Sequence, residues 1–134
     1  MKRILCGVVL AALLLLPALG LTEGDDTIQL ARTLYTLGRD ESFDTMIMLG
    51  NVVMNRVESS WYPDSIDGVI SQPHQFPHGT LYDDEALRAA REVMRGRRIL
   101  PESVLRYCDL EAAGLMEEAA LYTTSGSYAF YSGK

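Results

Sequence analysis

Residues 43–58 constrain the fold most, because the helix predicted there carries apolar side chains on nearly every face. These apolar positions are Met46, Ile47, Leu49, Gly50, Val53, Met54 and Val57. A helix that is apolar nearly all round is usually the buried centre of a domain. Asp40, Glu41 and Ser42 place negative charge and capping oxygens in front of it. We therefore expect a central helix at residues 43–58.

Elsewhere, the hydropathy pattern predicts shorter elements of both kinds, and so a small α+β domain that is mainly α. Asp25 or Asp26 can cap a first helix that stops at Gly38. Further helices are expected at residues 65–70 and 83–95, with a weaker helical segment at 110–121. Short strands are expected at residues 104–107 and 128–130.

Residues 1–20 have the layout of a secretory signal peptide. Two basic residues precede an apolar run at residues 4–16, and the small residues Ala18 and Gly20 are placed for cleavage. An uncleaved anchor is the alternative, but the run is shorter than the roughly 20 residues that a spanning helix needs. We predict a signal peptide followed by one domain at residues 21–134, exported to the cell envelope or beyond without stable membrane insertion.

Charge and cysteine content exclude several classes of protein. The formal net charge is −6, and basic residues cluster only at 88–98, so nucleic acid is not an expected partner. Cys108 is the one cysteine beyond the predicted leader, which rules out an intrachain disulfide, and its apolar neighbours predict burial. His74 and His78 have a metal-ligand spacing, but Pro77 interrupts the helix they would need. We expect neither a metal nor a cofactor.

Several motifs recur at the spacing of one known family. They are Ile28 to Tyr35, Arg39 to Phe43, Asn55-Arg56-Val57, Gly68-Val69-Ile70, Gln72-Pro73 and Gln75-Phe76. Together they resemble bacterial cell wall hydrolases of the spore cortex-lytic type, over roughly residues 26–131. The resemblance implies a lysozyme-like, lytic transglycosylase-like fold with a short sheet. It also implies an activity on peptidoglycan glycan strands, namely cleavage of the β-1,4 bond between N-acetylmuramic acid and N-acetylglucosamine.

The expected catalytic acid of that family is missing. The family usually reads Gly-Glu-(Ala/Ser)-Arg-Gly-Glu where residues 36–41 read Thr-Leu-Gly-Arg-Asp-Glu. One carboxyl group there would protonate the leaving oxygen and then accept the proton of the sugar's 6-hydroxyl, and Leu37 can do neither. Glu41 matches the second glutamate and is the candidate acid if the protein is an enzyme. The alternative is that Asp40 and Glu41 only stabilise the helix N-terminus.

The long loop at residues 59–82 is where the family's cleft would form. The groups that could hydrogen-bond to sugar rings or stack on them are Tyr35, Gln72, Gln75, Phe76 and Tyr82. The alternative role for these residues is loop anchoring, and for Phe76 and Trp61 core packing is expected. Asn55 and Arg56 are expected to be structural and to bond loop carbonyls near residues 60–68. Tyr128 stands where the family commonly has a histidine.

The sequence thus predicts an exported, peptidoglycan-directed protein of the cell wall hydrolase type, in which cleavage could be degenerate. The alternative is a non-catalytic module that binds glycan or another protein and has lost the acid. A structural interaction protein should instead expose an apolar patch, for instance around Leu37. Whether the chain is an enzyme therefore depends on where Glu41 and the loop groups lie.

Overall fold

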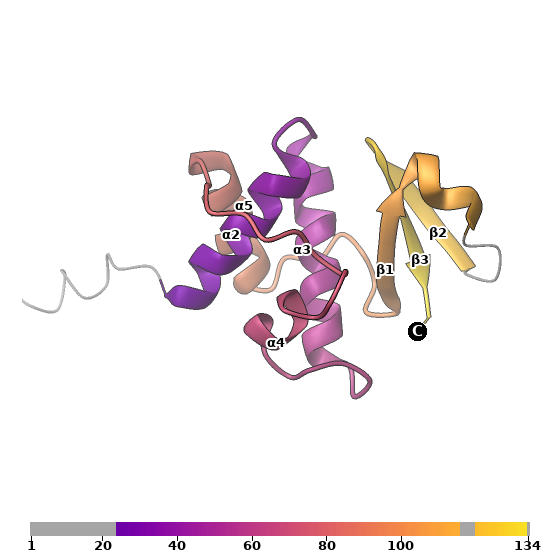
Figure 1. The fold of residues 1–134 in the computed structure, drawn as a ribbon, viewed down its shortest axis with the longest axis horizontal. Helices are drawn as coiled ribbons and strands as arrows, with labels where there is room; N and C mark the ends of the chain where they lie inside the picture. The colour runs from indigo at the N-terminus through magenta and orange to yellow at the C-terminus, as the bar shows by residue number, and fades with distance from the viewer. Residues whose placement is uncertain (1–23, 116–119, 134) are drawn as a thin grey trace, which may run out of the picture.

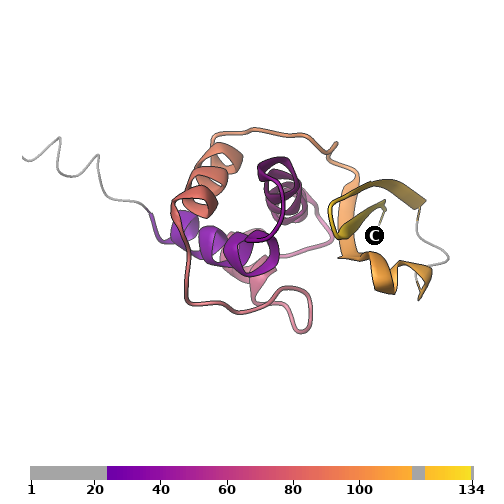
Figure 2. The same cartoon turned by 90° about the horizontal axis from the view of Figure 1, so that it is seen from above.

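The structure, a computed structural model, describes residues 24–115 and 120–133. Four helices form one side of the molecule and a three-stranded sheet forms the other, as Figures 1 and 2 show. In chain order the elements are α2 (Asp25–Gly38), α3 (Phe43–Glu58), α4 (Ile66–Ile70), α5 (Asp84–Met94), β1 (Val104–Asp109), η1 (Leu110–Leu115), β2 (Ala120–Ser125) and β3 (Tyr128–Ser132). The predicted signal peptide lies outside the described residues. Among the described helices, none is long and apolar enough to cross a membrane.

Helix α3 is the centre of the fold, as its sequence predicts. Every residue from Thr45 to Val53 is buried. Helices α2 and α5 pack on α3 from one side and β1 packs on it from the other. At its start, the Ser42 hydroxyl accepts a hydrogen bond from the Thr45 backbone N–H at 3.2 Å, which satisfies one of the free N–H groups of the first turn.

The two outer helices follow their sequence signals closely. The Asp83 carboxylate caps α5 by accepting from the Ala86 N–H at 2.8 Å. The buried residues of α5 form one apolar stripe: Ala86, Ala89, Ala90 and Val93. Helix α2 differs in one detail, since its N-cap is Gly24, without a side-chain cap. Asp25 and Asp26 lie one residue later, in the first turn, where negative charge stabilises the helix end without capping it.

The sheet is antiparallel, with the strand order β1-β3-β2. The register pairs Asp109 and Ser125 with Tyr128, on opposite sides of the central strand β3. The weak helical segment predicted at residues 110–121 is correct only in part: residues 110–115 form a 3-10 helix, but β2 begins at Ala120. Strand β2 exists because it pairs with β3, a partner that hydropathy spacing within the segment cannot reveal.

Three predicted packing roles need correction. Trp61 is 58% exposed and does not belong to the core, whereas Phe76 is buried as predicted. Cys108 is only half-buried. Asn55 is structural as expected, but it bonds the carbonyls of Pro101 and Val104, at 2.9 and 3.0 Å. The predicted partners near residues 60–68 were wrong because the chain entering β1 passes closer to the end of α3.

Candidate functional site

The site that the sequence predicts lies where the end of α2 meets the sheet. Leu37, in the last turn of α2, is half-buried and packs against the hydrophobic core. Its backbone carbonyl accepts a hydrogen bond from the Tyr128 hydroxyl at 2.7 Å. The position of the expected acid is therefore occupied by an apolar side chain, and its main chain is tied to β3.

Glu41 contacts the turn between β2 and β3. Both carboxylate oxygens lie 3.3 Å from the Ser127 backbone N–H, which donates to them. Gly126 has a left-handed conformation, with a φ of 56°, and a Cβ at this position would collide with the Glu41 carboxylate. Glu41 thus fastens the β2–β3 hairpin to the start of α3, which is a structural use of this carboxylate.

Three hydroxyl groups extend this contact into the protein. The Thr45 hydroxyl lies 2.6 Å from the Ser125 hydroxyl and 2.9 Å from the Ser42 hydroxyl. Thr45 is buried, so its hydroxyl needs such partners. The beginning of α3 is therefore bonded to the hairpin through Glu41 and through this hydroxyl chain.

A row of aromatic rings runs from the long loop to the end of α2. Phe76 stacks on Tyr107 with ring centroids 5.4 Å apart, and Tyr107 meets Tyr128 at 6.0 Å. The Tyr107 hydroxyl donates to the Gln75 carbonyl at 2.7 Å. Burial raises the pKa of Tyr128 to about 12, and the nearby Asp109 and Glu41 charges add to this rise. Burial likewise raises the pKa of Tyr107, so both phenols are protonated donors near neutral pH.

The predicted sugar-binding residues differ in burial and in the contacts that they make. Gln75 accepts from Arg56 at 3.0 Å through Oε1, and Phe76 is buried in the aromatic row. Gln72 is half-buried, and its Oε1 is buried without a partner among the described residues. Tyr35 is half-buried beneath the Arg39 guanidinium, 5.9 Å from the ring centroid, and Tyr82 is 41% exposed.

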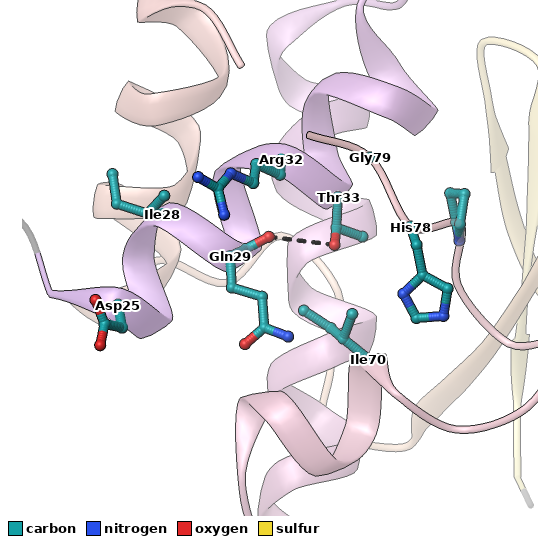
Figure 3. A pocket seen from close by; sticks show the side chains of 9 residues that line it. Asp25, Ile28, Gln29, Arg32, Thr33, Ile70, His78 and Gly79 are labelled. Carbon is teal, nitrogen blue, oxygen red and sulfur yellow. Dashed lines mark hydrogen bonds between the residues drawn. The ribbon is translucent and has the colours of Figure 1, made fainter. Parts of the chain in front are cut away.

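A pocket of about 390 Å³ lies between α2 and the loop, next to this region. Gln29 and Arg32 line it from α2, and His78 and Gly79 line it from the loop, as Figure 3 shows. The loop approaches the helix so closely that a Cβ at Gly79 would collide with the Thr36 hydroxyl. The pocket has the size of a small-ligand site and begins about one helical turn before Leu37.

No metal centre is found in the part of the chain that the structure describes, where no three ligating side chains come together. His74 is exposed and has a φ of 62°, and His78 faces the α2 pocket. Tyr107, in β1, and Ser127, in the β2–β3 turn, contact the site but were not predicted to do so. The residue pattern indicated strands near them, but it did not indicate which residues they would meet.

Known proteins resemble this chain in sequence and in fold. The sequence profile of the cell wall hydrolase family matches residues 40–131. A spore cortex-lytic enzyme from Halalkalibacterium halodurans is 32% identical over 80 residues, which are 54% of this chain and 24% of that protein. The chain thus spans about a quarter of the length of that relative.

Two solved structures share the fold. They are the catalytic domain of the Bacillus cereus SleB protein, 22% identical, and that of the germination-specific lytic transglycosylase SleB from Bacillus anthracis, 21% identical. Each covers 83% of this chain with a TM-score of 0.72, and the shared part is 93% and 98% of those chains. The lysozyme-like fold expected from the sequence is therefore confirmed. Because the profile matches most of the sequence, the chain belongs to the cell wall hydrolase family.

Proposed function

We propose that this is an exported, peptidoglycan-directed protein that binds glycan strands without cleaving them. The observation that carries the proposal is the half-buried Leu37 at the position of the expected acid. Lytic cleavage needs a group that donates a proton to the glycosidic oxygen and later accepts one from the sugar. A leucine side chain has no exchangeable proton, so this position supports binding and not chemistry.

A second candidate function is cleavage through Glu41, the neighbouring carboxylate. Its two oxygens accept from the Ser127 N–H, and the close contact with Gly126 leaves little room for another orientation. A catalytic acid must lie within hydrogen-bond reach of the oxygen that it protonates. Glu41 would have to leave the hairpin to act, so the contacts favour a fastening role for this residue.

Glycan binding is supported by the family and by the surface next to Leu37. The two SleB structures are described as catalytic domains, one of them from a lytic transglycosylase. In this chain the 390 Å³ pocket between α2 and the loop offers the Gln29 amide, the Arg32 guanidinium and the His78 imidazole. These are the donor and acceptor groups that sugar hydroxyls and acetamido groups use. Export suits this role, since the glycan lies outside the cytoplasmic membrane, and predicts a mature N-terminus at Leu21.

The test is incubation of the purified protein with peptidoglycan sacculi, followed by pelleting and mass spectrometry of the soluble fragments. The unaltered protein should pellet and should release no fragments with 1,6-anhydromuramyl ends. Leu37→Glu restores a carboxyl group at the expected position and should release such fragments. Leu37→Gln is the matched control, because it has the same length and polarity but no acid, and should stay inactive.

Three further variants extend the test to Glu41 and to the α2 pocket. Anhydro-ended fragments from the unaltered protein, lost in Glu41→Gln, would establish a relocated acid and overturn the proposal. If the protein does not pellet at all, glycan binding is wrong. Arg32→Ala should reduce pelleting by removing a wall of the α2 pocket, whereas Arg95→Ala, an exposed arginine just beyond α5, should leave it unchanged.

A further inference from the structure

Residues 77–82, which we call the strap, lie against α2 at the end of the α2 pocket that is nearest to Leu37. The strap supplies one wall of that pocket, and Figure 3 shows it reaching α2 at Gly79. A Cβ built at Gly79 would lie 3.3 Å from both the Thr36 Cβ and the Arg32 carbonyl oxygen. Because Thr36 directly precedes Leu37, a long ligand that runs along α2 from the pocket to Leu37 meets the strap on its way.

Hydrogen bonds hold the chain on both sides of the strap but not within it. Before the strap, the Tyr107 hydroxyl donates to the Gln75 carbonyl at 2.7 Å. After it, the Asp83 carbonyl accepts from the Leu87 N–H at 3.0 Å. Among the residues that the structure describes, none makes a hydrogen bond to the strap. A segment with few hydrogen bonds opens at a low cost in free energy, so the strap is a free span between two fixed ends.

Burial of apolar side chains does not hold the strap either. Phe76 before it and Ala86 after it are buried, whereas Leu81 is 67% exposed and Tyr82 is 41% exposed. The close contact with α2 is made by Gly79, which has no side chain to bury. Hydrophobic stabilisation is roughly proportional to the apolar area removed from water, so lifting the strap off α2 gives up little of it.

We propose that the strap opens away from α2 to admit a glycan chain, which then runs from the α2 pocket past Thr36 to Leu37. This inference rests on the proposed function, glycan binding, and adds how the glycan enters. The two ends of the span, Pro77 and Asp83, are the positions about which the strap turns. The closed strap limits the pocket to short ligands. The open strap joins the pocket to the surface at Leu37.

A removable crosslink between the strap and α2 tests this. Thr36→Cys and Gly79→Cys are combined with Cys108→Ser, which removes the half-buried free thiol. The 3.3 Å between the two Cβ positions is close to the roughly 3.5–4.5 Å that a disulfide needs. Oxidised glutathione forms the crosslink, and dithiothreitol removes it. Pelleting on peptidoglycan sacculi should be lost on oxidation and should return on reduction. The reduced protein is the matched control, because it carries the same substitutions.

The crosslink experiment separates this inference from the proposed function. Equal pelleting in the two redox states, with the crosslink verified by mass spectrometry, would overturn the strap and leave glycan binding standing. If the unaltered protein does not pellet, glycan binding is wrong and the strap proposal falls with it. If the crosslink does not form, the strap does not close on α2 and the proposal is also wrong.

Gly79→Ala gives an independent test without a crosslink. Its Cβ would collide with the Thr36 hydroxyl, so this variant should hold the strap away from α2. We expect Gly79→Ala to pellet at least as well as the unaltered protein. Loss of pelleting in a Gly79→Ala protein that is folded, as judged by circular dichroism, would show that binding needs the closed strap and would overturn the proposal.

Discussion

The two ends of α3 both hold the sheet, but they do so in different surroundings. At the C-terminal end, the Arg56 Nε–H donates to the Leu105 carbonyl at 2.7 Å, and Arg56 is 2% exposed. At the N-terminal end, Glu41 is half-buried and meets the exposed Ser127 at 3.3 Å. The first end is an interior anchor. The second is a surface contact, four residues after Leu37.

The difference in burial indicates which end of α3 tolerates substitution better. Burial lowers the pKa of Arg56 by disfavouring its charged form, and the rings of Tyr62 and Phe76 lie 4.8 and 5.1 Å from the guanidinium carbon. A buried charge is tolerated only when its partners are complete. Glu41 and Ser127 are less buried than Arg56, so substitutions at this end should disturb the fold less.

The largest effect is expected from breaking the interior anchor. Arg56→Met keeps the length of the side chain but removes its bonds to Leu105 and Gln75, and the free energy of unfolding should fall by about 3 kcal/mol. Urea unfolding measures this. Arg56→Lys keeps the charge without the fork of donors and should recover only part of the loss. If Arg56→Met has the same free energy of unfolding as the unaltered protein, the C-terminal end of α3 is not a stronger anchor than the N-terminal end.

A smaller effect is expected at the hairpin. Gly126→Ala adds a Cβ to a left-handed residue and drives it into Glu41, which should cost about 2 kcal/mol. Gly96→Ala is the matched control, since Gly96 also has a positive φ, of 105°, but nothing lies within 4 Å of its Cβ. Adding Glu41→Ala should recover stability in Gly126→Ala and not in Gly96→Ala. Additive losses in both double variants would contradict the contact.

The smallest effect is expected from Tyr128→Phe, which removes the bond to the Leu37 carbonyl and should cost about 1 kcal/mol near neutral pH. Because the folded-state pKa of Tyr128 is raised to about 12, its stabilisation is complete below about pH 10 and is lost as the pH rises through 12. The free energy of unfolding, measured with urea, should fall less steeply between about pH 10 and 12 in Tyr128→Phe than in the unaltered protein. Tyr122→Phe, at a 52% exposed position, should show the pH dependence of the unaltered protein. If Tyr128→Phe also keeps that pH dependence, the Tyr128 hydroxyl does not contribute as proposed.

Signals within a few residues of each other were enough to predict where the helices lie. The apolar circumference of residues 43–58 predicted a central α3, and Ser42 and Asp83 predicted the capped starts of α3 and α5. Each of these signals acts within one or two helical turns. Strand β2 has no such local signal, so its segment was read as helix. Its conformation depends on β3, which lies beyond it in the chain.

The candidate site also has features that the sequence predicted and features that only the folded chain shows. The amino-acid sequence predicted the family register, with Leu37 at the position of the expected acid, because both depend on residue order alone. Glu41 contacts Ser127, 86 residues away. Asn55 and Arg56 are bonded to carbonyls 46 to 49 positions later in the chain. Such contacts form when the chain folds back on itself, and residue spacing carries no information about them. The exposure of Trp61 was likewise set by the packing around it, since hydrophobicity favours burial without specifying which side chains reach the core.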